Sequence, residues 1–228
     1  MGVAKDVRFT LTVPRNVHIE ASGVQTDIDV EGVSGDVDAE TVQGDIRVVG
    51  GGRLKLESVE GDIVISGARG RVQASTVNRG IQVRDVVGDL DLETVNGPIV
   101  VSKVQAGSVD ASTVNGRIVY DGTLRDGGDY ALATHNGQIW LVVPNGTNAS
   151  ISVSTFNGEL DTSFDIPQFR SEARRRSYNF VLGSGKARID LETFGGDINL
   201  RRPGESLPTA VAPRAPQAPK VRVRTGNE

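Results

Sequence analysis

Acidic residues recur at alternate positions in this sequence, and their type and spacing are the first features that could do chemistry. Eight of them occupy matching places in a repeated segment: Asp38, Glu40, Glu57, Asp91, Glu93, Asp110, Asp190 and Glu192. Two carboxyl groups at a suitable separation can act as general acid and general base in polysaccharide cleavage. The same spacing is typical of the solvent-exposed face of a sheet, so an enzyme is the alternative interpretation.

Other reactive residues give weaker signals. The chain has no cysteine, which excludes disulfides and thiolate chemistry, and its two histidines are His18 and His135. His135 stands in a column that otherwise holds Val or Phe, so we expect it to pack at a corner. Clustered calcium-binding GGxGxD units, a nucleophile elbow, a P-loop and a dinucleotide fingerprint are all absent from the sequence. We therefore predict no catalytic residues, no cofactor and no metal site.

Charge and hydropathy narrow the possible partners. The net charge is −4 and the pI is near 5.3, which argues against a nucleic-acid binder that depends on phosphate neutralisation. No apolar run reaches the length of a transmembrane helix. Lys5 and Asp6 stand where a signal peptide needs its apolar core, so none is expected in this stretch.

A repeat of about eighteen residues organises most of the chain. A branched apolar residue returns two positions after a turn glycine or its replacement: Ile28, Ile46, Ile63, Ile81, Ile99, Ile118, Ile139, Leu160 and Ile198. Successive members are 17 to 21 residues apart until the last step, from 160 to 198, which we interpret as a coil that carries an insertion.

Further columns follow the same register. A hydroxyl column contains Thr41, Ser58, Thr76, Thr94, Thr113, Thr134, Thr155 and Thr193, and an asparagine column contains Asn78, Asn96, Asn115, Asn136 and Asn157. Apolar and polar residues alternate before each hydroxyl, as in strands with one buried face. In the segment STVNRG we expect Thr76 and Val77 to help fill the core and Asn78 to join a stacked amide ladder. Arg79 is expected to point outward from an altered turn.

The short repeat excludes a helical crossover or a propeller blade in each unit. It predicts an all-β, single-domain parallel β-solenoid of about nine coils of 17–21 residues, with two glycine turns per coil. An antiparallel β-sandwich of short hairpins is the competing fold. Like residues at a constant offset favour the solenoid, because a parallel register stacks them on one another.

The predicted solenoid divides the chain into three parts. Residues 1–23 form an N-terminal cap strand and the entry to the first coil, and residues 24–202 form the repeats, with an insertion or flap at 161–187. Residues 203–228, rich in Pro and Arg, are predicted to be a disordered tail.

Two groups of residues are candidates for interaction. Val100, Val119 and Trp140 occupy outward positions in consecutive coils, and an outward apolar stripe usually marks an interface. Alternatively, the flap folds over this stripe with Phe164, Ile166 and Phe169. A basic cluster on the flap, which could meet anionic glycans, lipids or acidic proteins, contains Arg170, Arg174, Arg175 and Arg176.

The segments GDIRV, ETVNGPIVV, STVNGRI and IDLETFGGDINL together resemble a bacterial β-strand-repeat family of unknown function that is described as adhesin-like. The resemblance implies a parallel β-solenoid at the cell envelope or cell surface, without established catalytic residues. It favours a non-enzymatic scaffold that binds envelope glycans or surface proteins. A polysaccharide-acting enzyme on the acidic face and a self-associating structural protein remain the alternatives.

Overall fold

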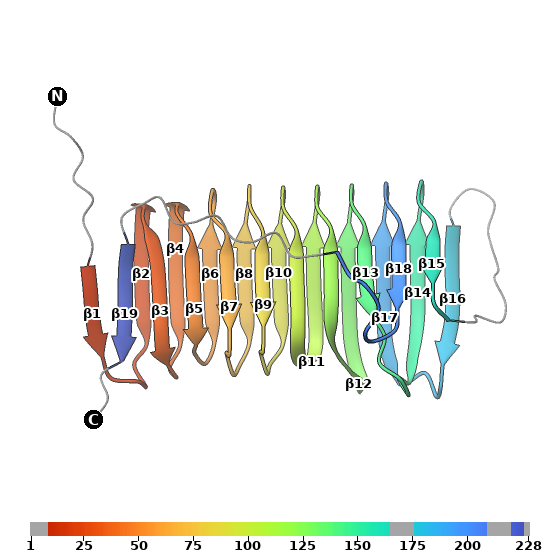
Figure 1. The fold of residues 1–228 in the computed structure, drawn as a ribbon, viewed down its shortest axis with the longest axis horizontal. Helices are drawn as coiled ribbons and strands as arrows, with labels where there is room; N and C mark the ends of the chain where they lie inside the picture. Colours follow the sequence, from red (N-terminus) through yellow and green to blue (C-terminus); the bar gives the residue numbers. More distant parts are fainter. Residues whose placement is uncertain (1–8, 165–175, 209–219, 226–228) are drawn as a thin grey trace.

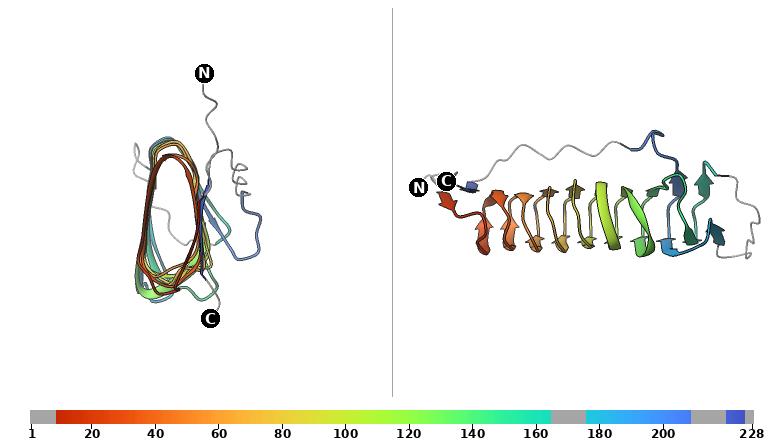
Figure 2. Two further views of the ribbon diagram at one scale, coloured as in Figure 1. Left: turned by 90° about the vertical axis from the view of Figure 1, so that its left-hand side faces the viewer. Right: turned by 90° about the horizontal axis from the view of Figure 1, so that it is seen from below.

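The computed structural model describes residues 9–164, 176–208 and 220–225, and these residues form strands and turns without a helix. Nineteen strands join in one continuous sheet, which winds into a flattened coil with two long faces (Figures 1 and 2). Nearly all pairings between neighbouring strands are parallel and in register. The predicted parallel β-solenoid is therefore confirmed.

Each coil contributes one strand to each face. Face A contains β2 (Ile19–Gln25), β4 (Val37–Gln43), β6 (Leu54–Ser58), β8 (Val72–Thr76), β10 (Leu90–Thr94), β14 (Ala149–Thr155), β16 (Arg176–Leu182) and β17 (Ala187–Thr193). Face B contains β1 (Phe9–Val13), β3 (Asp27–Val33), β5 (Ile46–Gly50), β7 (Ile63–Ser66), β9 (Ile81–Arg84), β13 (Ile139–Val142), β15 (Leu160–Thr162), β18 (Ile198–Arg201) and β19 (Lys220–Thr225). The long strands β11 (Ile99–Thr113) and β12 (Ile118–Thr134) continue from face B into face A.

The coils do not all stack in chain order. Seven consecutive coils, from β2–β3 to the second half of β12 with β13, follow one another along the chain. The coil β17–β18 then packs directly on β12 and β13, and the earlier coil β14–β15 lies beyond it. The interpretation of the 160-to-198 step as a coil with an insertion does not include this change of order. The layer next to β12 and β13 is occupied by β17 and β18, which come later in the chain than β14 and β15.

Side-chain hydrogen bonds agree with this order. Each buried hydroxyl of the predicted column donates to a turn carbonyl in the coil beneath it. Thr193 Oγ1 donates to the Gly137 carbonyl at 3.2 Å, and Thr155 Oγ1 donates to the Gly196 carbonyl at the same distance. Since Gly137 follows β12 and Gly196 follows β17, the layers run β12, β17, β14.

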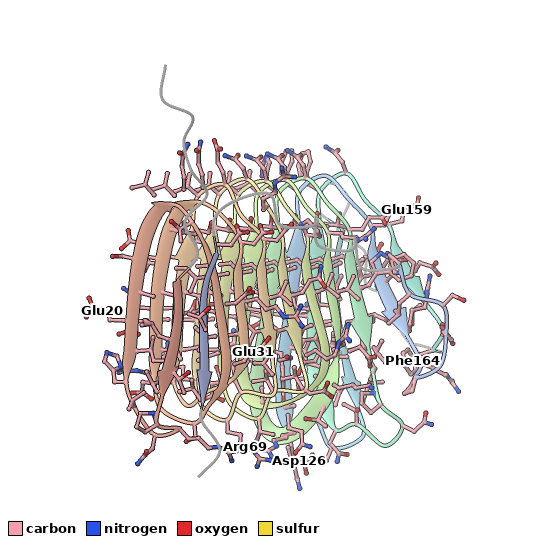
Figure 3. The ribbon with its side chains drawn as sticks, turned by 60° about the vertical axis from the view of Figure 1, so that its left-hand side comes forward. Glu20, Glu31, Arg69, Asp126, Glu159 and Phe164 are labelled. Atoms are coloured by element: carbon pink, nitrogen blue, oxygen red, sulfur yellow. The ribbon has the colours of Figure 1, made fainter. Side chains whose placement is uncertain are left out.

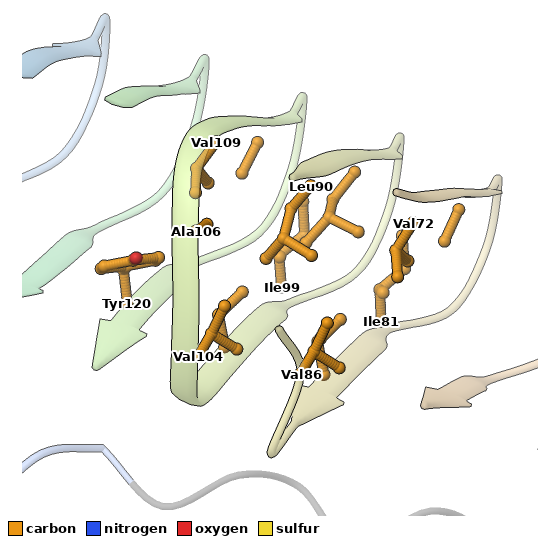
Figure 4. Close-up of a cluster of buried hydrophobic side chains, with 14 of the residues drawn as sticks. Val72, Ile81, Val86, Leu90, Ile99, Val104, Ala106, Val109 and Tyr120 are labelled. Atoms are coloured by element: carbon orange, nitrogen blue, oxygen red, sulfur yellow. The ribbon is translucent and has the colours of Figure 1, made fainter. Parts of the chain in front are cut away.

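The core consists of aliphatic columns that project inward from both faces (Figure 4). Eight isoleucines of the predicted column are 1% exposed or less: Ile28, Ile46, Ile63, Ile81, Ile99, Ile118, Ile139 and Ile198. Removing apolar surface from water contributes about 25 cal/mol per Å². Stacking identical coils therefore stabilises the fold through burial as well as through the backbone ladder.

An amide ladder runs along the corner where face A turns into face B. Asn96 donates to Asn78 at 3.1 Å, Asn115 to Asn96 at 2.8 Å, and Asn136 to Asn115 at 3.0 Å. Figure 3 shows side chains standing in a row along this upper corner. The predicted ladder is confirmed for these four residues, and Arg79 beside it is exposed, as expected.

Aspartates tie neighbouring turns of this corner together. Asp27 Oδ1 accepts from the backbone N–H of Asp45 at 3.0 Å, Asp45 Oδ1 from that of Asp62 at 2.8 Å, and Asp62 Oδ1 from that of Gly80 at 3.0 Å. Burial raises the pKa of Asp45, and the carboxylates of Asp62 and Asp27 raise it further, against the opposing bond from Asp62 and the charge of Arg79. The row of aspartates therefore adds hydrogen bonds between the turns, but it also brings negatively charged carboxylates close together.

Both ends of the solenoid are covered. At one end β16 pairs antiparallel with β14, so part of the predicted flap forms an edge strand. At the other end β19 lies between β1 and β3 and is parallel to both. For residues 220–225 the structure thus differs from the predicted disordered tail. Residues 165–175, 209–219 and 226–228 lie outside the described residues.

Substitution of Gly116 tests how closely the coils approach. A Cβ atom there would lie 1.9 Å from the Gly97 carbonyl oxygen of the coil beneath, so the backbone must shift. We expect Gly116→Ala to lower the free energy of unfolding by about 2–4 kcal/mol in chemical denaturation. Gly107→Ala is the control, because the nearest atom to its Cβ would be 3.6 Å away. Equal stability of the two variants would contradict the close stacking.

Asp45→Asn tests the crowded carboxylates. The amide oxygen keeps the bond from Asp62, whereas the buried charge is removed. Because the folded-state pKa of Asp45 lies above the ordinary value of 3.8 for an aspartate, the native state holds its proton more tightly. The contribution of Asp45 to wild-type stability should thus fall as pH rises from about 4 through the raised pKa. We expect Asp45→Asn to be more stable than wild type at pH 7. Chemical denaturation at several pH values should show that the variant lacks the pH dependence that Asp45 contributes. Coincident stability–pH curves would refute it.

Candidate interaction surface

The predicted stripe on the outer side of face B is only partly accessible. Val100 and Trp140 are half-buried, and Val119 between them is 3% exposed. The neighbour of Trp140 in the next layer is Asn199, because β18 separates β13 from β15. The exposure on which the prediction of this interaction patch rested is therefore absent at Val119.

A different segment from the one predicted lies near this stripe. Residues 202–208, which follow β18, run along the outer side of face B beside β13 (Figures 1 and 2). The Arg201 guanidinium lies 5.1 Å from the centre of the Trp140 ring, and Trp140 Nε1 donates to Gln138 at 3.3 Å. Trp140 is thus held by interactions within the chain.

The flap prediction can be followed only in part. Phe164 is half-buried against the core, and the Arg202 guanidinium lies 5.2 Å from its ring. Ile166, Phe169, Arg170, Arg174 and Arg175 fall outside the described residues, and Arg176 begins β16, opposite Thr155. The basic cluster stays a prediction.

The acidic residues of face A lie on an open surface and several have basic partners. Glu57 pairs with Lys55 at 3.0 Å, Asp190 with Arg188 at 2.7 Å, and Asp91 with Arg71 at 3.4 Å. The bond to Glu57 raises the pKa of Lys55. Exposed pairs of this kind contribute little to stability. Their neutralised charge also offers less to an acid–base mechanism than buried carboxyl groups would.

A continuous apolar corner is the strongest surface feature. We call it the corner ridge. Eight of its residues directly follow the eight buried hydroxyls, and Val24 occupies the same register position after Gly23: Val24, Val42, Val59, Val77, Val95, Val114, His135, Phe194 and Phe156. Val77 is 38% exposed and Phe156 is 50% exposed, whereas the preceding Thr76 is buried. The expectation that Val77 fills the core is thus wrong. Strict alternation points it outward.

Three rings extend the corner ridge at the end of the stack. His135 and Phe194 have centroids 4.8 Å apart and planes 6° apart, and Phe194 and Phe156 have centroids 4.9 Å apart and planes 4° apart. These rings come from layers β12, β17 and β14, so the unusual coil order builds the ladder. Both faces of Phe194 are covered by its neighbours, whereas His135 and Phe156 each have one neighbouring ring. The packing role expected for His135 fits this arrangement.

An open groove of about 610 Å³ lies between the corner ridge and the acidic column of face A. The three rings and Val114 form its apolar side. Glu93, Ser112, Ala133 and Glu192 form its opposite side. The groove therefore combines an aromatic wall with a negatively charged rim.

The sequence contained a signal for this surface that was missed. The residue directly after each hydroxyl of the column is Val, His or Phe. Two phenylalanines at this position are unusual in a chain with 4% aromatic residues. The order in which the three rings stack could not be inferred, because β14 and β17 carry the same column residues.

Other functional features can be stated for residues 9–164, 176–208 and 220–225. In these ranges no three His, Asp or Glu side chains gather in a way that could hold a metal ion. They also contain no helix with the length and apolarity required to cross a membrane.

Comparison with known proteins agrees with the fold and leaves the activity open. The family described as Toastrack DUF4097 matches residues 5–201. No curated protein and no solved structure matches the chain. The matched range contains the whole stack of coils from β2 to β18 and is most of the chain. The chain therefore belongs to the Toastrack family, a β-solenoid repeat domain of unknown function.

Proposed function

We propose that this solenoid is a non-enzymatic binding scaffold of the bacterial cell envelope that engages a partner protein along the corner ridge. The observation that carries the proposal is the mostly exposed corner ridge from Val24 to Phe156, in which valines and phenylalanines predominate. Contiguous exposed apolar surface is typical of protein interfaces, which are enriched in aromatic residues. The envelope location rests on the resemblance to the adhesin-like repeat family.

The aromatic geometry favours a protein partner over a glycan. A sugar ring packs best on an open aromatic face, but Phe194 is covered on both faces and Trp140 faces Arg201. The ring ladder and the valine methyl groups suit the apolar side chains of a protein segment. Glu93 and Glu192 on the groove rim favour basic residues beside those apolar groups.

The acidic face gives less support to an enzyme. A general acid is usually a carboxyl group whose pKa burial has raised, and catalytic groups are usually enclosed away from bulk water. The acidic column of face A is exposed or half-buried, and Lys55, Arg71 and Arg188 neutralise part of it.

A photo-crosslinking residue at Val114 tests this function in envelope extracts. We expect one discrete adduct with a partner protein, and none from the matched control position Gln73, which is exposed on face A away from the corner ridge. Excess wild-type chain should abolish the adduct. A Phe156→Ser/Phe194→Ser chain should compete about tenfold less well, since interface aromatics often contribute 2 kcal/mol or more.

Four outcomes would contradict the proposal. Equal adducts from Val114 and Gln73, or equal competition by the variant, would remove the corner ridge as the site. An adduct containing only two copies of the chain would instead indicate self-association. Cosedimentation with purified peptidoglycan that the double variant abolishes would reassign the surface to a glycan.

A further inference from the structure

The N-terminal end of face B has an unusual layer order. β1 leads through a short turn to β2 and then β3, so β1 would be expected to stack directly on β3. Instead β19, from the other end of the chain, occupies the layer between them (Figure 1). β1 therefore has β19 as its pairing partner among the described strands. The edge of β3 therefore pairs with a strand that is distant from it in the sequence.

This edge carries a column of buried acids. Asp27, Asp29 and Glu31 alternate with the core residues of β3, and thus project to the outer side of face B. Asp27 is 4% exposed and Asp29 is 8% exposed, whereas Arg47, which stands opposite Asp29 on β5, is exposed. Buried carboxylates are costly unless positive charge or hydrogen-bond donors compensate them.

Asp27 shows that this compensation is incomplete on the β5 side. Its Oδ1 accepts from the Asp45 backbone N–H, but its buried Oδ2 has no hydrogen-bond partner among the described residues. The neighbouring side chain in the next coil is Asp45, a second carboxyl group. The side of Asp27 away from Asp45 faces β19, where Lys220 stands in register.

The register of β19 places a basic residue opposite each acid of β3. Lys220 stands opposite Asp27, Arg222 opposite Asp29, and Arg224 opposite Glu31. The two intervening valines of β19 stand opposite core residues of β3. A slip by one residue would bring valines opposite the carboxylates, so charge and apolarity both select this register.

We propose that the β3 edge is a binding site for an extended peptide in which basic and apolar residues alternate, and that the chain's own C-terminal strand is its resident occupant. Binding is strand addition: backbone hydrogen bonds give affinity, and the acidic column of Asp27, Asp29 and Glu31 gives specificity. The site is independent of the corner ridge. A strand of the same pattern from a partner can occupy it when the resident strand leaves.

Peptide binding to the full chain tests the proposal. A labelled peptide with the sequence of residues 219–226 is titrated against wild type and against Arg222→Glu/Arg224→Glu, in which the resident strand is weakened. The tethered strand competes at a high effective concentration, so we expect at least about tenfold tighter binding to the variant. Arg69→Glu/Arg84→Glu, with the same change in net charge at exposed positions elsewhere, should bind as weakly as wild type.

Charge reversal at the acceptor identifies the site. Adding Asp29→Lys/Glu31→Lys to the weakened chain should restore amide protection of residues 220–225 in hydrogen exchange and abolish binding of the basic peptide. Binding that is unchanged by these acceptor substitutions would overturn the proposal. So would protection of residues 220–225 that persists in Arg222→Glu/Arg224→Glu without the acceptor change.

Cross-linking identifies the resident strand. The chain has no cysteine, so Val13→Cys/Thr225→Cys introduces a single possible disulfide at a register pair of β1 and β19. Strand neighbours are about 4.8 Å apart, within the range that a disulfide bridges. We expect a disulfide within one chain. A disulfide-linked dimer would overturn the assignment of the chain's own strand as occupant.

Discussion

Parallel, in-register stacking of one coil on the next is the interaction on which the rest of this structure depends. The backbone ladder bonds, the hydroxyl bonds to turn carbonyls and the amide ladder all require the same register between neighbouring layers, and the amide ladder also requires the same residue type. The turns approach so closely that a methyl group at Gly116 would overlap the coil beneath. Sequence repetition is thus a direct consequence of layer geometry.

The interior of the fold could be predicted because its constraints are periodic. The isoleucine column, the hydroxyl column and the asparagine ladder each follow from alternation within a strand and identity between strands. The corner ridge follows from the same alternation, but Val77 was assigned to the core because apolar residues are usually buried. Its position after the inward Thr76 was the more reliable guide.

The order of the last coils could not be predicted, because the repeat pattern is the same for either order. β14 and β17 present equivalent apolar residues and a threonine at the same register positions, so either can pack on β12. The same limit applies to β19, whose alternating charges match β3 although proline-rich sequence precedes it. Strands that leave chain order depend on complementarity between distant segments, which a repeat pattern does not encode.

Coil order also determines the candidate surface, since the ring ladder exists only if His135, Phe194 and Phe156 belong to successive layers. Disulfide formation between engineered outward cysteines of face A tests this most directly. Ala133→Cys/Glu192→Cys and Ser154→Cys/Glu192→Cys join register neighbours and should oxidise readily, because adjacent strands are about 4.8 Å apart. Ala133→Cys/Ser154→Cys spans two layers and should stay reduced. Ser154→Cys/Glu192→Cys joins neighbours in either coil order and serves as the positive control. Rapid oxidation of Ala133→Cys/Ser154→Cys, with none in Ala133→Cys/Glu192→Cys, would show that the coils stack in chain order and would contradict this account.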